Sequence, residues 1–169
     1  MKQRNRIFLL GFMGSGKSTL GKQVANDLNY RFVDLDDWIE NRTCKSISQI
    51  FEEDGEEEFR KLETESLEHL MNEENIVVAL GGGTPCFNEN MSLINNIGVS
   101  VFLDVSESVL VERLLGEQSH RPLLKNKSKE ELQDFVSRLL GKRKADYLKA
   151  DIKVGENGDL LESLKAYLA

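Results

Sequence analysis

Residues 11–19, which read GFMGSGKST, have the composition of a phosphate-binding loop. They fit the pattern G-x-x-x-x-G-K-[ST] through Gly11, Gly16, Lys17 and Ser18. The glycines let backbone N–H groups turn inward around an anion, and the helix that follows adds partial positive charge at its N-terminus. In this pattern Lys17 reaches the β- and γ-phosphates, and the hydroxyl of Ser18 binds Mg²⁺. The loop therefore predicts a nucleotide-binding site.

Asp34 and Asp36 form a second candidate group, because they follow the apolar residues 31–33. We interpret them as the end of a strand, where positions i and i+2 share one face. Beside a nucleotide, one carboxylate can support Mg²⁺ and its waters while the other accepts a proton from a hydroxyl group. The alternative is a solvated acidic start of a helix, in which Asp37 is a favourable charge in the first turn.

Glycines 81–83, in the stretch ALGGGTP, directly follow an apolar run. Without side chains, the backbone can approach a small ligand closely and offer it N–H donors. A plain turn is the alternative interpretation.

The fourth candidate group consists of Arg60, Arg121 and Arg143, in a chain that is acidic as a whole. A planar guanidinium suits a carboxylate or phosphate because it offers paired N–H donors. Glu63 follows Arg60 by three residues and could orient it on one face of a helix. A solvated surface position is the alternative for each arginine.

Apolar runs alternate with segments of helical periodicity along the chain, which predicts a parallel sheet covered by helices. The runs are residues 7–10, 31–33, 76–80 and 99–103. Capping-box spacings that mark helix starts pair Ser46 with Gln49, Ser128 with Glu131, and Asp159 with Glu162. Ligands of open α/β sheets bind outside the carboxyl ends of the strands, where the loop, the aspartates and the glycines all fall.

The whole chain has 169 residues and a formal net charge of −7, and we expect it to form one domain, residues 1–169. The acidic balance argues against a nucleic acid or an anionic membrane as partner. Cys44 and Cys86 have neither zinc-site nor disulfide-framework spacing, which favours reduced thiols in the cytoplasm. The apolar run near the N-terminus ends at the phosphate loop, too early for a signal peptide, and no later segment reaches membrane-spanning length.

Five motifs occur in order and at fitting intervals: GFMGSGKST, DLD, DGEEEFRKLE, LGGGTP and RPLL. With them the chain resembles the shikimate kinases over about residues 6–150. The resemblance implies a three-layer α/β fold with a five-stranded parallel sheet in the order 2-3-1-4-5, a P-loop and a mobile lid at about residues 116–128. It also implies transfer of the γ-phosphoryl group of ATP to the 3-hydroxyl of shikimate, with Mg²⁺ as cofactor, in the biosynthesis of chorismate and aromatic amino acids.

The resemblance further implies a role for particular residues. ATP binding falls to Gly14, Ser15, Gly16, Lys17, Ser18, Thr19 and Arg121. Shikimate binding falls to Asp36, Arg60, Gly82 and Arg143, and metal binding to Ser18 and, through water, Asp34. The expected catalytic residues are Lys17, Asp36 as the base, and Arg121 of the lid. Phe51 and Phe59 match aromatics that shape the acceptor pocket, and Arg113 matches a residue that packs on adenine. We expect a cytoplasmic monomer that binds shikimate and ATP.

Two alternative functions stay open at this point. The first is a kinase of the same fold for another small polyol acid such as gluconate. The second is a nucleotide-dependent switch or binding module, for which the chain lacks a guanine-reading N-K-x-D motif, since Asn126 and Lys127 are followed by Ser and Lys.

Overall fold

The computed structural model describes residues 5–117, 124 and 126–169. Its strands are β1 (Arg6–Leu10), β2 (Arg31–Asp34), β3 (Ile76–Ala79), β4 (Val99–Asp104) and β5 (Ile152–Gly155). Its helices are α1 (Lys17–Leu28), α2 (Leu35–Thr43), α3 (Ile47–Glu53), α4 (Gly55–Leu70), η1 (Thr84–Cys86), α5 (Asn90–Ile97), α6 (Glu107–Gly116), α7 (Lys129–Tyr147) and α8 (Leu160–Leu168).

The five strands form one parallel sheet in the order β2-β3-β1-β4-β5, which confirms the predicted fold class. All four apolar runs of the sequence became strands, and their ends moved by no more than one residue. β1 lies in the centre between β3 and β4, so its carboxyl end is also the centre of the carboxyl edge of the sheet.

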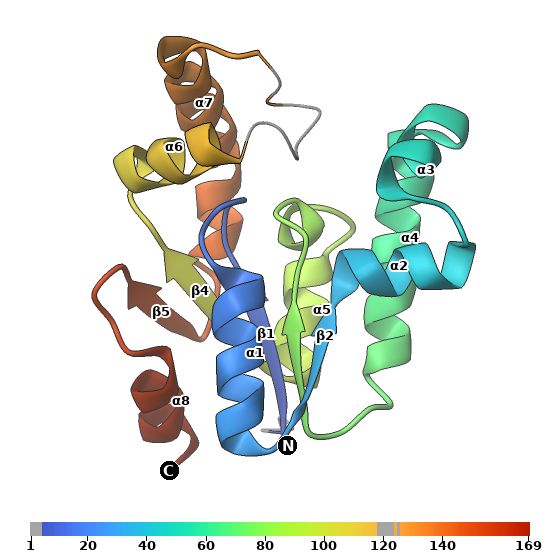
Figure 1. The fold of residues 1–169 in the computed structure, drawn as a ribbon. Helices are drawn as coiled ribbons and strands as arrows, with labels where there is room; N and C mark the ends of the chain where they lie inside the picture. Colours follow the sequence, from blue (N-terminus) through green and yellow to red (C-terminus); the bar gives the residue numbers. More distant parts are fainter. Residues whose placement is uncertain (1–4, 118–123, 125) are drawn as a thin grey trace.

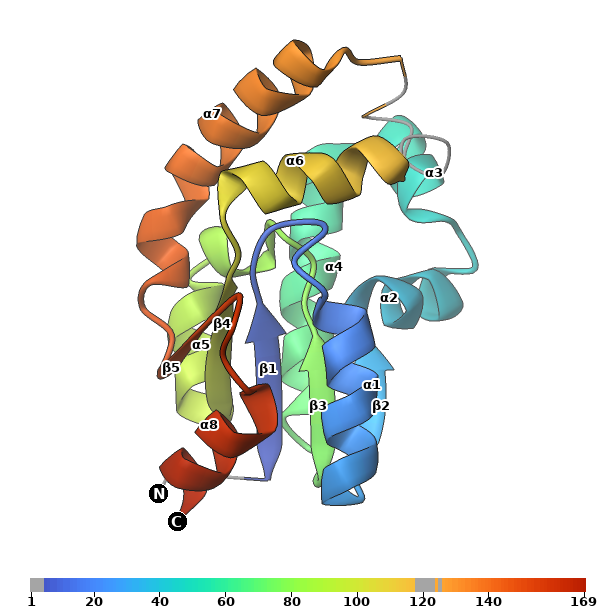
Figure 2. The same cartoon turned by 60° about the vertical axis from the view of Figure 1, so that its left-hand side comes forward.

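Two apolar clusters sandwich the sheet and make the three layers visible in Figures 1 and 2. Side chains of a strand alternate between its faces. Ile7 and Leu9 therefore pack in the cluster that contains α1 and α8, while Phe8 and Leu10 pack in the cluster that contains α4, α5 and α7. The α2–α3 and α6–α7 pairs rise beyond the carboxyl edge on opposite sides of it (Figure 1).

The predicted helix starts are present as capped N-termini. Ser46 and Ser128 make complete capping boxes with Gln49 and Glu131. Asp159 accepts a hydrogen bond from the backbone N–H of Glu162 and caps α8. Each such cap satisfies a backbone donor that the helix leaves unpaired.

Gly98, at the turn between α5 and β4, provides a test of how tightly this turn packs against β1. A Cβ there would lie 2.6 Å from the backbone oxygen of Arg6 and 2.6 Å from Phe8 Cε2. We expect Gly98→Ala to lower the free energy of unfolding by about 1–3 kcal/mol, because a filled core must shift to admit the methyl group. Urea denaturation measures the change.

Gly141 is the matched control for this substitution. It lies in α7, and a Cβ there would meet nothing within 4 Å. Gly141→Ala should leave the stability unchanged or raise it by up to about 1 kcal/mol through helix propensity. Equal effects of the two substitutions would contradict the packing argument.

Candidate active site

The phosphate loop connects the end of β1 to the start of α1. Gly16 is the N-cap of α1, has a φ of 94°, and makes no side-chain capping bond, so the first N–H groups of the helix stay available to an anion. Gly14 has a φ of 80°, a conformation that favours glycine. The ammonium group of Lys17 donates to the backbone oxygens of Gly11 and Phe12, both at 2.9 Å. The loop thus has the shape of an anion site in the structure.

Asp34 and Asp36 do not lie on one strand, so that part of the prediction is wrong. The strand β2 ends at Asp34, and Asp36 belongs to the first turn of α2. The reason is that Asp34 Oδ1 accepts the backbone N–H of Asp36 at 3.1 Å and caps the helix. Its other oxygen, Oδ2, accepts a hydrogen bond of 2.8 Å from Ser18 Oγ. The cap therefore also places Asp34 beside the phosphate loop.

Asp36 has the strongest electrostatic perturbation among the carboxylates near the loop. Its Oδ1 atom is buried and has no hydrogen-bond partner within the described part of the chain. Desolvation, and then the negative charges of Asp34 and Glu63, raise the pKa of Asp36 to about 6, although Lys17 lowers it. A carboxylate with such a pKa can accept a proton near neutral pH.

Arg60 lies on α4, where two carboxylates and two aromatic rings surround its guanidinium group. Its Nη1 donates to Glu63 Oε2 at 2.8 Å, as the spacing in the sequence suggests, and its Nε and Nη2 donate to Glu56 Oε1 at 3.2 and 3.1 Å. Glu63 is fully buried, and Thr84 Oγ1 donates to its other oxygen at 2.5 Å. Desolvation raises the pKa of Glu63, and the charge of Arg60 opposes that shift. The ion pair therefore fixes Arg60 to a buried anchor.

Arg143 lies on α7, one helical turn before Tyr147. The Tyr147 hydroxyl donates to the backbone oxygen of Gly82 at 2.5 Å and so ties α7 to the glycine segment. Arg143 Nη1 is buried without a hydrogen-bond partner among the described residues. A buried donor of this kind is rare in native proteins and indicates a place for a ligand.

Glycines 81–83 bring the predicted acceptor residues together. A Cβ on Gly81 would lie 3.2 Å from Asp36 Oδ1, one on Gly82 would lie 3.0 Å from Arg143 Nη1, and one on Gly83 would lie 2.7 Å from Arg60 Nη1. Each side chain therefore packs directly against backbone at one glycine. We call these three glycines the glycine wall.

A cavity of about 810 Å³ runs along the phosphate loop to the glycine wall. It is lined by residues of the loop, by both aspartates, by Gly81 and Gly82, by Arg113 and by Val154, Gly155, Glu156 and Gly158. Arg113 Nη1 donates to the backbone oxygen of Gly14 at 2.9 Å. Arg60 and Arg143 do not line this cavity itself but adjoin it at the wall.

Sequence reasoning missed some residues of the site. The turn after β5 was not assigned, although its place at the carboxyl end of a strand was a usable signal. Tyr147 follows Arg143 by four residues and hence shares its helix face, which was a second signal. Thr84 follows the glycines without any pattern that marks it.

Two predicted features are only partly described or not described. Arg121 lies outside the described residues, as does most of the predicted lid at 116–128. Of the predicted aromatic pair, Phe59 is buried and Phe51 is 38% exposed, with ring centroids 4.7 Å apart.

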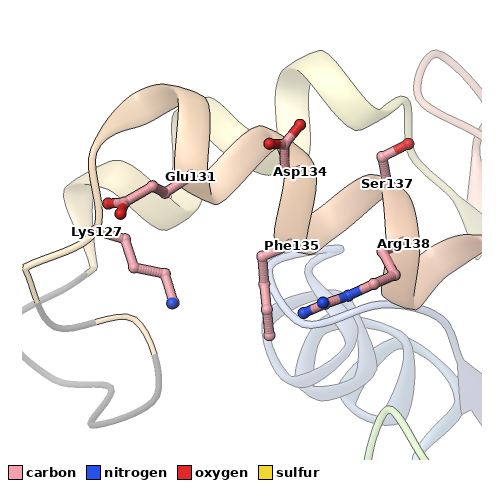
Figure 3. A pocket seen from close by; sticks show the side chains of 6 residues that line it. All are labelled: Lys127, Glu131, Asp134, Phe135, Ser137 and Arg138. Atoms are coloured by element: carbon pink, nitrogen blue, oxygen red, sulfur yellow. The ribbon is translucent and has the colours of Figure 1, made fainter.

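A second hollow, of about 570 Å³, lies on the N-terminal half of α7 and contains none of the predicted residues (Figure 3). It is lined by Lys127, Glu131, Asp134, Phe135, Ser137 and Arg138. Two acidic and two basic side chains are spread along this hollow without converging on one point, so it points to no class of ligand.

Comparison with known proteins decides the family. The model of the shikimate kinase family matches residues 13–167. The chain belongs to the shikimate kinase family. It is an ATP-dependent kinase with the P-loop fold of that family. A curated shikimate kinase from Phocaeicola vulgatus is 50% identical over 145 residues, which cover 86% of this chain and 83% of the relative.

Solved structures of family members agree with the fold described above. The crystal structure of shikimate kinase from Bacteroides thetaiotaomicron is 43% identical and has a TM-score of 0.87, covering 96% of this chain and 95% of its own. Shikimate kinase from Acinetobacter baumannii in complex with shikimate is 30% identical, has a TM-score of 0.83, and covers 99% of this chain and 92% of its own. Membership of this family favours a shikimate kinase over the gluconate kinase and over the nucleotide-dependent switch.

Proposed function

We propose that this chain transfers the γ-phosphoryl group of ATP to the 3-hydroxyl of shikimate, and that the glycine wall forms one side of the acceptor site. The observation that carries the proposal is the convergence of Asp36, Arg143 and Arg60 on three successive glycines. One carboxylate base and two guanidinium groups match an acceptor that carries hydroxyls and one carboxylate. The unpartnered atoms Asp36 Oδ1 and Arg143 Nη1 would then find their partners in the substrate.

The phosphate loop would hold ATP through its backbone N–H groups and Lys17, with Ser15 and Thr19 in the same segment. Gly14, Gly16 and Ser18 complete the predicted ATP contacts. Lys17 would exchange its bonds to the loop's own carbonyls for bonds to the β- and γ-phosphates. The contribution of Arg121 from the lid stays a prediction from the sequence.

The residues at the loop fit Mg²⁺. The described residues contain no group of three or more His, Cys, Asp or Glu that could hold a metal ion by themselves. Mg²⁺ does not need such a group, because it is commonly bound by one or two carboxylates, waters and the substrate phosphates. Ser18 Oγ and Asp34 Oδ2, 2.8 Å apart, would hold it directly and through water. When bound, Mg²⁺ offsets negative charge on the phosphates.

Positioning accounts for most of the expected catalysis. Phosphoryl transfer needs the attacking oxygen in line with the leaving group and charge stabilisation on the transferred group. Arg60 and Arg143 would orient the acceptor through its carboxylate, which places the hydroxyl next to Asp36. Asp36 would then take the hydroxyl proton as the oxygen attacks.

A coupled assay that measures ADP release tests the proposal. ATP is offered with shikimate, with gluconate and with nucleoside monophosphates in separate reactions. We expect turnover with shikimate alone. Turnover confined to gluconate, or strong binding of GTP without turnover of any acceptor, would replace the proposal with one of the two alternatives.

Removal of Arg60 should weaken acceptor binding and leave nucleotide binding intact. A hydrogen bond to a charged group contributes about 1.5–3 kcal/mol, so Arg60→Ala should weaken shikimate binding about 10- to 150-fold. Fluorescence of Trp38, the sole tryptophan and two residues from Asp36, provides the binding signal. ATP affinity measured alone should change little.

Arg138→Ala is the control, because Arg138 is exposed on α7 and lines the second hollow, which contains none of the acceptor residues. Shikimate methyl ester, which lacks the charge, should bind the parent poorly and lose much less on the Arg60→Ala change. Equal binding of acid and ester by the parent would disprove the carboxylate contact.

Two statements about the whole protein are also proposals: that it is a monomer, and that it works in the cytoplasm. No helix among the described residues is long and apolar enough to cross a bilayer. Light scattering at working concentration would establish the mass in solution.

A further inference from the structure

The guanidinium group of Arg60 donates to carboxylates and lies over two aromatic rings. Three of its N–H groups donate to Glu56 and Glu63. Its Cζ atom lies 4.1 Å from the ring centroid of Phe87 and 5.2 Å from that of Phe59. The shorter of these distances is close ring contact, well inside the range of a cation–π interaction.

Phe87 has no evident role in the core. Its ring is 38% exposed, and it belongs to neither of the two apolar clusters that sandwich the sheet. A large apolar ring at the surface is otherwise unexplained here, and Arg60 is the cation that it covers. By contrast, Phe59 is buried in the core cluster, where packing alone explains it.

The segment that carries Phe87 is fastened to α4 on both sides of the ring. Before it, Thr84 Oγ1 donates to Glu63. After it, Asn88 Nδ2 donates to the backbone oxygen of Arg60 at 3.2 Å. These two hydrogen bonds fix the position of the Phe87 ring relative to the guanidinium. The segment that carries the ring also connects the glycine wall to α4.

We propose that Phe87 is a positioning residue for acceptor binding, which acts by fixing the plane of the Arg60 guanidinium. The inference rests on the proposed function, in which Arg60 binds the carboxylate of the acceptor. Guanidinium binds carboxylate through in-plane N–H groups, so the orientation of the plane decides whether the two N–H groups without a partner among the described residues face the ligand. Edge contacts from Glu56 restrain that plane weakly, because the Glu56 side chain is 58% exposed. The Phe87 ring, whose centroid lies 4.1 Å from Cζ, is close enough to restrict the rotation of the guanidinium.

The experiment compares Phe87→Leu with Phe87→Tyr in steady-state kinetics. Phe87→Leu should raise the KM for shikimate about 3- to 30-fold, the range of a partly desolvated cation–π contact. Its kcat and its KM for ATP should stay within about twofold of the parent, since Phe87 is not in the nucleotide cavity. Phe87→Tyr keeps an aromatic ring at this position, so its KM for shikimate should equal that of the parent.

Two controls separate positioning from general damage. Tyr167→Leu removes a ring of similar exposure, 39%, from α8 and should change no kinetic parameter. In an Arg60→Ala background, Phe87→Leu should add no further loss of shikimate binding, because the group that it positions is gone. Should Phe87→Leu fail to fold, Phe87→Met provides the same comparison.

The outcomes distinguish this inference from the proposed function. A parent protein that does not phosphorylate shikimate overturns the proposed function, and the inference with it. A parent that uses shikimate, together with an unchanged KM in Phe87→Leu, overturns the inference alone. So does a Tyr variant as weak as the Leu variant, or an equal loss from Phe87→Leu with and without Arg60.

Discussion

Replacement of Lys17 with alanine is expected to lower kcat by about 10²- to 10³-fold, because a positive charge aimed at the transferring phosphoryl group is lost. In the structure, the Lys17 ammonium spans the phosphate loop through two bonds of 2.9 Å to backbone oxygens. The variant should stay folded, because the side chain of Lys17 lines the cavity and does not pack in the core. Steady-state rates of phosphoryl transfer at saturating ATP and shikimate measure the effect.

Lys22→Ala is the control for this variant, because Lys22 lies exposed on the same helix. We expect near-parent kinetics from it. A Lys17→Ala enzyme with near-parent kcat would remove the phosphate loop from the mechanism, whatever the family of the chain.

Replacement of Asp36 with asparagine should lower kcat by about 10²- to 10⁴-fold, the usual contribution of a positioned proton acceptor. The parent should also lose activity as the pH falls through about 6, because protonation of Asp36 removes the base. In Asp36→Asn this limb of the pH–rate profile should be absent. Asp27→Asn, an exposed change on α1, should keep the parent profile.

The same substitution should affect stability in the opposite direction. The folded-state pKa of Asp36 is raised, so the protonated group favours folding at low pH and that advantage disappears as the pH rises through about 6. At pH 8 the ionised carboxylate therefore opposes folding. Asp36→Asn should raise the free energy of unfolding at pH 8, by at most about 3 kcal/mol for a shift of this size. A fall in stability at pH 8 would show that Asp36 is paired in the folded state.

The sequence pattern predicted four of the five strands and the phosphate loop because these are local patterns, whereas β5 has no apolar run that marks it. Four apolar runs, and a loop whose every required position lies within residues 11–18, need no distant partner for their interpretation. The interpretation of Asp36 as a residue of the same strand as Asp34 failed for a local reason too. The side chain of Asp34 can cap a helix, and this option competes with extension of the strand.

What the sequence left open depends on contacts between distant residues. The spacing of Arg60 and Glu63 predicted their ion pair, but not the Thr84 hydroxyl that holds Glu63 from 21 residues away. The hydrogen bond from Tyr147 to Gly82 joins residues 65 apart, and the cation–π contact between Arg60 and Phe87 also joins different elements. The topology of the sheet determines which of these distant residues meet, and local patterns in a single sequence do not reveal it.

The glycine wall has a consequence for inhibitors and for resistance to them. A compound that rests on Gly81–Gly83 would contact backbone atoms, which no codon change removes. A side chain introduced there to exclude the compound would also displace a residue of the active site. A Cβ at each position would lie within 2.7–3.2 Å of Asp36, Arg143 or Arg60. Resistance mutations in the glycine wall would therefore lower the activity of the enzyme while they exclude the compound, so we expect few of them to be selected.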